Sequence, residues 1–250
     1  MDFTSAANAA LVKRPALEGI DQPPAGLLAR LRHYSRRYGF WHAAASFIGR
    51  SSFDLWQWIG PTVTRPHLRR WLESDSPKIL NLGGGNVLFD RWLTADVVPR
   101  ADVYMNVTRP LPLPDVCVDA VYSEEVIEHL PLELGRSMLR ECLRVLKPDG
   151  WLRLTTPSLD YFARRVLASP DHAAEINDIF YRHEHRHIYS EAELHHELTA
   201  SGFVHLRASS YRESESRLGY LDSHPERHTF APPEWSQYWE AQKPAVARSA

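Results

Sequence analysis

A short apolar strand that turns abruptly into three glycines constrains this chain more than any other feature. Residues 78–86 read KILNLGGGN. Glycine lets the backbone approach a ligand closely and adopt a positive φ without a Cβ clash. A strand that feeds such a turn builds a nucleotide-type pocket at the carboxyl edge of an open α/β sheet. Because glycine clusters also mark ordinary loops, the interpretation depends on the residues that follow.

The composition of the chain limits its class and its partners only broadly. The chain has 250 residues, 44% of them hydrophobic and 24% charged, with a net charge of -2. This balance gives no strong signal for a nucleic-acid partner. The two cysteines, Cys117 and Cys142, indicate a reducing compartment without a disulfide framework. No apolar run is long enough for a membrane span, and the N-terminus lacks a signal-peptide pattern, so we expect a cytoplasmic protein.

Three regions follow from the local composition. Residues 1–25 are small, polar and proline-rich, which predicts a mobile tail. Residues 26–75 are basic and aromatic and are expected to form a helical extension, with a helix starting at Pro66. Residues 76–245 show an alternating α/β pattern and are expected to form the main domain.

The extension carries an uneven charge. Eight arginines lie between residues 30 and 70, against the single acid Asp54. The pattern fits an ordinary solvated helical face. It also fits a peripheral membrane or protein contact through residues 30–70, or a phosphorylated or nucleic-acid partner.

The main domain is predicted to be a Rossmann-like, doubly wound and mostly parallel seven-stranded sheet. Its helices are expected at 132–146, where apolar residues recur at helical spacing, and at 190–201, which opens with a capping-box pattern. Its strands are expected at 78–82, 92–97, 102–106, 117–122, 150–156, 203–210 and 236–241.

Polar residues recur where these strands end. Asp96 closes the second strand, where a carboxylate can accept both hydroxyls of a ribose, and Asn106 closes the third. Three further segments follow in order: LPLPD at 111–115, SEEVIEHL at 123–130 and LKPDG at 146–150.

This order resembles the class I S-adenosylmethionine-dependent methyltransferases, in the small-molecule "type 11" branch. The resemblance covers residues 77–160 at the level of motifs and extends more loosely to 241. It implies S-adenosylmethionine as cofactor. The residues that would contact it are Asn81, Gly83, Gly84 and Gly85 at the methionine end, Asp96 at the ribose, Val97, Asn106 and Val107 beside the adenine, and Ser123 and Glu125 at the methionine or the reaction zone.

The chain departs from the family in two places. Asn81 stands where the family usually has an acid. Too few residues separate Gly85 from Trp92 for the usual helix between strands one and two, because such a crossover needs about a dozen residues.

Histidines are the candidates for proton transfer. His187 and His129 are the candidate catalytic residues, since a hydroxyl acceptor needs a proton acceptor near the reacting atoms. A structural role for Glu128 and His129 on a short helix is equally compatible with the sequence. His183, His185 and His187 share one face only in an extended segment, and with 13 histidines in the chain we expect no metal site.

The sequence therefore predicts an S-adenosylmethionine-dependent methyltransferase. It would act on a small-molecule or saccharide acceptor, by O-methylation through direct displacement. A non-catalytic binding module or partner subunit with the same fold is the alternative. A nicotinamide-dependent oxidoreductase is disfavoured, because no helix directly follows the glycines and no Tyr-x-x-x-Lys pair is present. The acceptor and the oligomeric state do not follow from the sequence.

Overall fold

The computed structural model describes residues 27–41, 43–44, 53–85, 87–89, 92–213, 215–227 and 232–245. The expected tail, residues 1–25, lies outside the described residues. The chain divides into two compact units, residues 1–107 and 108–250, and each is described by itself. The domain limits expected from the sequence stay a prediction.

In its described residues, the first unit combines helices α2 (Leu27–Tyr38) and α4 (Phe53–Glu73) with three parallel strands. The strands are β1 (Ile79–Leu82), β2 (Leu93–Asp96) and β3 (Val103–Tyr104). The strands lie in the order β3-β2-β1, with Leu80 opposite Leu93 and Ala95 opposite Val103. All four residues of β1 are buried, as expected for a strand covered on both faces.

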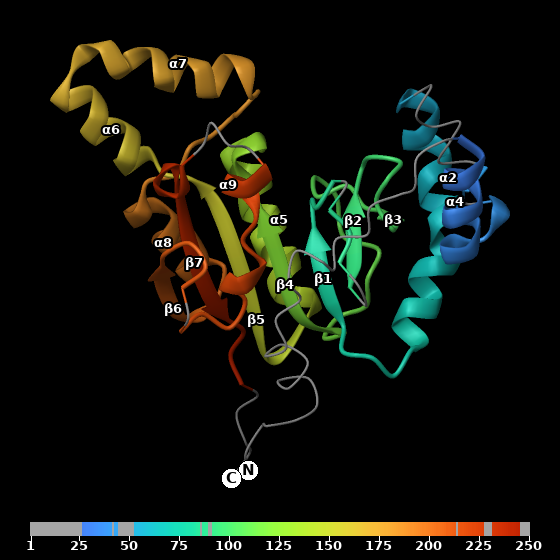
Figure 1. Cartoon of the computed structure of the whole chain (residues 1–250). Helices are drawn as coiled ribbons and strands as arrows, with labels where there is room; N and C mark the ends of the chain where they lie inside the picture. The colour runs from blue at the N-terminus through green and yellow to red at the C-terminus, as the bar shows by residue number, and fades with distance from the viewer. Residues whose placement is uncertain are drawn as a thin grey trace, which may run out of the picture. The chain divides into compact units, whose positions relative to one another are not determined.

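Helix α4 covers the open edge of β3 (Figure 1). A Cβ at Gly60 would lie 2.9 Å from the ring of Tyr104, so glycine permits this close approach. The Tyr104 N–H donates to Thr64 Oγ1 at 3.0 Å. The expected helix start at Pro66 is wrong, because one helix runs through both Pro61 and Pro66. The Thr64 hydroxyl, which accepts the Tyr104 N–H, donates in turn to the Gly60 carbonyl at 2.9 Å.

The second unit builds four strands: β4 (Val118–Glu124), β5 (Leu146–Pro157), β6 (Val204–Ser209) and β7 (Ser236–Gln242). Their order is β4-β5-β7-β6. Strands β4 and β5 are parallel, whereas β7 is antiparallel to both β5 and β6. The helices are α5 (Leu132–Val145), α6 (Leu159–Ala168), α7 (Ala173–Arg182), α8 (Glu191–Ala200) and α9 (His224–Arg227), with short 3-10 turns η2 (Ile127–His129), η3 (Pro170–His172), η4 (Gly219–Leu221) and η5 (Pro233–Trp235).

The two helices expected from the sequence are confirmed. Helix α5 buries the row Met138, Cys142 and Val145 that predicted it. Helix α8 begins as the capping box predicts, since the Ser190 hydroxyl accepts the Glu193 N–H at 3.2 Å.

All seven expected strands are present, and the mostly parallel Rossmann-like fold class is confirmed. Strand β5 begins at Leu146 rather than at residue 150. Asp149, at a φ of 63°, and Gly150 exchange backbone hydrogen bonds with Lys243, which hold the start of this strand. Among the described residues, no helix is both long and apolar enough to cross a bilayer.

Candidate functional site

The glycine turn leaves β1 in a conformation that needs glycine. Gly83 has a φ of 76° and Gly85 a φ of 57°, both in the left-handed region. The Gly83 N–H donates to the Ala95 carbonyl at 2.8 Å, which ties the turn to β2. A Cβ at Gly85 would meet none of the described residues within 4 Å, so in the described part of the chain the turn borders open space there.

Gly84 is required for a different reason. A Cβ there would lie 2.1 Å from Asn81 Nδ2, because the Asn81 side chain fills the inside of the turn. The Asn81 amide donates to the Val87 carbonyl at 3.1 Å and to Thr94 Oγ1 at 3.3 Å. The Asn81 amide group thus braces the turn that carries the glycines. Its predicted contact with the methionine end of the cofactor stays a prediction.

The structure brings Asp96 to the glycine turn. Asp96 Oδ2 accepts the Gly85 N–H at 2.8 Å, and Oδ1 accepts the Val98 N–H at 3.2 Å. Burial raises the pKa of this carboxyl, against the backbone N–H groups that lower it. A carboxylate has about four acceptor positions, so these two bonds leave capacity for ribose hydroxyls.

A second acid supports β2 and was not singled out from the sequence. Asp102 is fully buried; its Oδ2 accepts the Thr94 N–H at 2.8 Å and its Oδ1 accepts the Tyr38 hydroxyl at 2.5 Å. Asp102 therefore links α2 to the strand that carries Asp96. Spacing along the chain gave no signal for this link, since Tyr38 lies 64 residues away.

The remaining adenine-side candidates lie after their strands in the first unit. Val97 directly follows β2, while Asn106 and Val107 follow β3, and all three are partly exposed. Their predicted contacts with the adenine stay predictions.

In the second unit, Ser123 and Glu125 lie at the carboxyl end of β4. Ser123 is buried, and its hydroxyl has no hydrogen-bond partner among the described residues. Glu125 has a φ of 55°, and its carboxylate accepts the Ser236 hydroxyl at 2.8 Å. A buried polar group without a partner and a non-glycine residue at positive φ are both features that cluster at functional sites.

Glu128, His129 and His185 form a compact cluster. One candidate ligand atom from each lies within 4.8 Å of the other two. The rings of His129 and His185 meet edge to face, with centroids 4.7 Å apart. Burial lowers the pKa of both histidines, that of His185 to about 3, and raises the pKa of Glu128 well above its usual range.

His187, the other catalytic candidate, faces a different partner. Its Nε2 lies 2.8 Å from Glu193 Oε1, and its ring packs on Tyr189 with centroids 4.5 Å apart. The structure thus brings His129 together with His185 rather than with His187. A catalytic role for either candidate stays a prediction.

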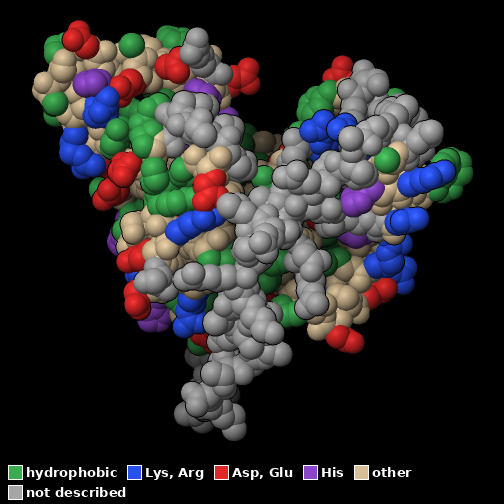
Figure 2. Space-filling model, viewed as in Figure 1, with side chains coloured by type: hydrophobic (Ala, Val, Ile, Leu, Met, Phe, Trp, Pro, Cys, Tyr) green, Lys and Arg blue, Asp and Glu red, His purple; other side chains and the backbone are tan. Residues whose placement is uncertain are grey.

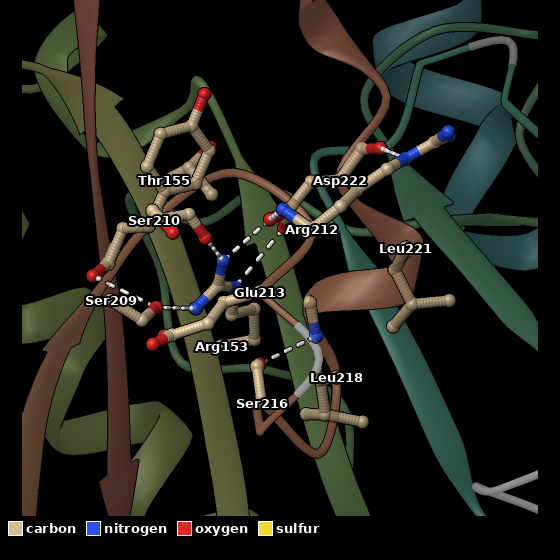
Figure 3. Close-up of polar contacts among 12 residues, drawn as sticks. Arg153, Thr155, Ser209, Ser210, Arg212, Glu213, Ser216, Leu218, Leu221 and Asp222 are labelled. Carbon is tan, nitrogen blue, oxygen red and sulfur yellow. Dashed lines mark hydrogen bonds and ion pairs between the residues drawn. The ribbon is translucent and has the colours of Figure 1, made fainter. Parts of the chain in front are cut away.

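A buried ion pair in the second unit joins β5 to the segment that precedes α9 (Figure 3). Arg153 on β5 and Asp222 are both completely buried, with Nη2 2.5 Å from Oδ2 and Nε 3.1 Å from Oδ1. The guanidinium also donates to the Ser209 hydroxyl and to the Ser210 carbonyl. Every charged atom of the pair therefore has a partner, which indicates a structural role for this network.

Comparison with known proteins places the glycine turn and Asp96 in a family. Residues 81–154 match the family model described as "Methyltransferase domain". The chain is similar to this family over that stretch, which is less than half of its length. The match includes every predicted cofactor contact, and it ends on β5.

Curated relatives are similar to the chain over 81 residues. A protein of Mycobacterium tuberculosis H37Rv named "Probable S-adenosylmethionine-dependent methyltransferase" is 41% identical over 81 residues, covering 32% of this chain and 29% of the relative. A similarly named protein of Mycolicibacterium smegmatis is 38% identical over 81 residues, covering 32% of this chain and 31% of the relative. The matched stretch thus spans less than a third of these relatives.

Solved structures resemble the chain more loosely. A SAM-dependent methyltransferase from Archaeoglobus fulgidus is 15% identical with a TM-score of 0.45, over 73% of this chain and 94% of that one. One from Methanosarcina mazei is 15% identical with a TM-score of 0.45, over 72% and 98%. Similarity of this extent says nothing about activity.

Proposed function

We propose that this chain is an S-adenosylmethionine-dependent methyltransferase. The observation that carries the proposal is the hydrogen bond between the Gly85 N–H and Asp96 Oδ2 at 2.8 Å. It unites the two sequence motifs that would hold the adenosyl group, inside the stretch that matches the methyltransferase domain.

The residues present fit this cofactor. Gly85 borders open space, where the backbone can approach a ligand, and the Asp96 carboxylate beside it has acceptor positions for the ribose hydroxyls. Bound S-adenosylmethionine supplies a methyl group activated by its sulfonium. The protein's part is to hold the acceptor in line with that methyl group and to exclude water, which contributes several kcal/mol through orientation.

For the acceptor, we propose a small molecule or a saccharide that is methylated on oxygen. A hydroxyl acceptor must lose a proton, and histidines are suited to receive it near neutral pH. His187 and His129 are the two candidates. Incubating the protein with labelled S-adenosylmethionine and a panel of hydroxylated small molecules and sugars tests this proposal, and transfer to nitrogen acceptors alone would contradict it.

Calorimetry tests the cofactor assignment directly. We expect S-adenosylmethionine and its demethylated product to bind with micromolar dissociation constants, and the Asp96→Ala variant to bind at least about tenfold more weakly. Asp75→Ala is the matched control, because Asp75 is an exposed acid of the same unit. A folded parent protein that binds neither compound would instead favour the non-catalytic module.

We also propose that residues 30–70 contact a membrane surface or a protein. Figure 2 shows Lys and Arg side chains gathered over the part of the first unit that α2 and α4 form. Trp41 and Trp58 are each 81% exposed, and large exposed aromatic residues beside basic ones are typical of interfacial contacts. Sedimentation with anionic vesicles tests the membrane form, with Trp58→Ser expected to bind less.

We also propose that the protein is located in the cytoplasm. Cys117 and Cys142 are both free in the structure, as in a reducing compartment. Fractionation of cells that express the chain is the corresponding test.

A further inference from the structure

We propose that Glu128, His129 and His185 bind a divalent first-row transition-metal ion. The proposal is independent of the methyltransferase function, because it concerns residues of the second unit and is tested by metal binding alone. In the sequence His185 lies between His183 and His187, a group from which we expected no metal site, whereas the fold brings His185 together with Glu128 and His129.

The three side chains come from two separate segments that the backbone holds together. Glu128 and His129 are neighbours on η2, and His185 lies between α7 and α8. The carbonyl of Glu128 accepts the N–H groups of Arg186 at 2.7 Å and His187 at 3.0 Å. The loop that carries His185 is thereby fixed against the short helix that carries the other two residues. A site that exists before the ligand arrives loses less entropy when the ligand binds.

The distances suit a shared ion. Glu128 Oε1 lies 3.7 Å from His129 Nε2 and 3.9 Å from His185 Nε2. Two ligand atoms at about 2.0–2.1 Å from a tetrahedral Zn²⁺ lie roughly 3.4 Å apart. Small side-chain movements therefore suffice to bring all three atoms to one ion. The present separations are too long for direct hydrogen bonds, so the three groups face one another without bonding.

An unpartnered carboxylate oxygen points into this cluster. Glu128 is 0% exposed, and its Oε1 has no hydrogen-bond partner among the described residues. Its Oε2, by contrast, accepts the Thr156 hydroxyl at 3.0 Å, which fixes the carboxylate so that Oε1 faces the histidines. Buried polar atoms are nearly always satisfied, and a bound cation would satisfy Glu128 Oε1.

The exposure of the cluster also fits a metal site. The His129 side chain is 44% exposed while that of His185 is 9% exposed, so an ion can enter on the His129 side. Two histidines and one carboxylate are a ligand set of zinc and iron sites that keep a position for water or substrate.

The test uses the full-length, untagged chain, stripped of metal with a chelator. Titration with Zn²⁺ in competition with a fluorescent chelator measures affinity and stoichiometry, and Co²⁺ reports on coordination through its visible absorption. We expect one equivalent of Zn²⁺ to bind. His129→Gln and His185→Gln should each weaken binding at least tenfold and should reduce the Co²⁺ bands.

Matched controls separate this site from adventitious binding by the chain's 13 histidines. His183 and His187 each lie two residues from His185, but neither belongs to the cluster. The variants His183→Gln and His187→Gln should therefore bind Zn²⁺ like the parent. Because His129 is partly exposed, its substitution should leave the fold intact, and circular dichroism confirms this. A parent without bound Zn²⁺, or a folded His129→Gln variant with unchanged affinity, overturns the proposal.

Discussion

The N–H of Gly85 donates to Oδ2 of Asp96 at 2.8 Å, and this bond joins the glycine turn after β1 to the tip of β2. The two residues are 11 positions apart, with no helix among the described residues between the two strands. The short connection expected from the sequence is therefore confirmed. The carboxylate compensates for the missing helix, because it anchors the turn directly.

Replacing Asp96 with asparagine should weaken binding of S-adenosylmethionine by about 10-fold to 100-fold. The amide keeps the size of the side chain, but hydrogen bonds to a charged group are worth about 1.5–3 kcal/mol and would be lost. Calorimetry measures the change, with Asp75→Asn as control. Equal affinity in Asp96→Asn and the parent would show that the carboxylate does not hold the ribose.

Gly84→Ala should lower the free energy of unfolding by about 1–3 kcal/mol. The new Cβ would lie 2.1 Å from Asn81 Nδ2 and 2.8 Å from Thr94 Cγ2, which is overpacking. Urea denaturation measures the loss. In the double variant with Asn81→Ala the clash with the amide disappears, so the two effects should not add. Strict additivity would mean that the Asn81 side chain does not occupy the turn.

Asp222→Asn should lower the free energy of unfolding by about 3–5 kcal/mol, because it leaves the buried Arg153 charge without its counter-ion. The double variant Arg153→Met with Asp222→Leu removes both charges and should recover much of that loss. Urea denaturation of the parent, the single variant and the double variant measures these differences in the free energy of unfolding. A single variant no less stable than the double would contradict the account of a buried, mutually dependent pair.

The thiol of Cys142 should be inert in the folded protein. Burial raises its pKa to about 12, from an ordinary value of 9.0. At pH 7–9 the folded thiol thus stays protonated, and alkylation measured by mass spectrometry should label Cys142 only in urea. Since the unfolded state alone loses the proton between pH 9 and 12, the free energy of unfolding should fall as pH rises through that range. Cys142→Ala should remove this contribution, and rapid labelling of folded protein at pH 8 would contradict the assignment.

If His187 is the general base, His187→Gln should reduce kcat by about 10²-fold to 10⁴-fold with little change in cofactor binding. Steady-state kinetics with the acceptor found in the panel, together with calorimetry, measure the two quantities. His195→Gln, on the neighbouring helix α8, is a control outside the candidate residues. An unchanged kcat would indicate that His187 has a structural role beside Glu193 and is not the general base.

The local elements could be predicted because each depends on nearby residues. The apolar row of α5 and the capping box of α8 are properties of contiguous sequence, as is the change from β1 to glycine. Helix α4 was only partly predicted, since proline normally marks a boundary and here lies inside a helix that packs on β3. Packing on a neighbouring strand outweighed the local preference.

The fold class, the glycine turn and the acid at the tip of β2 could all be predicted from the sequence. These depend on backbone preferences and on the alternation of strands and helices along the chain. Which side chains share a site depends on the folded structure. It placed His185 beside Glu128 and His129 instead of beside His187, and it buried Arg153 against Asp222, 69 positions away. Such partners are chosen by packing and by the cost of leaving a buried polar group unpaired, and neither is written in the local sequence.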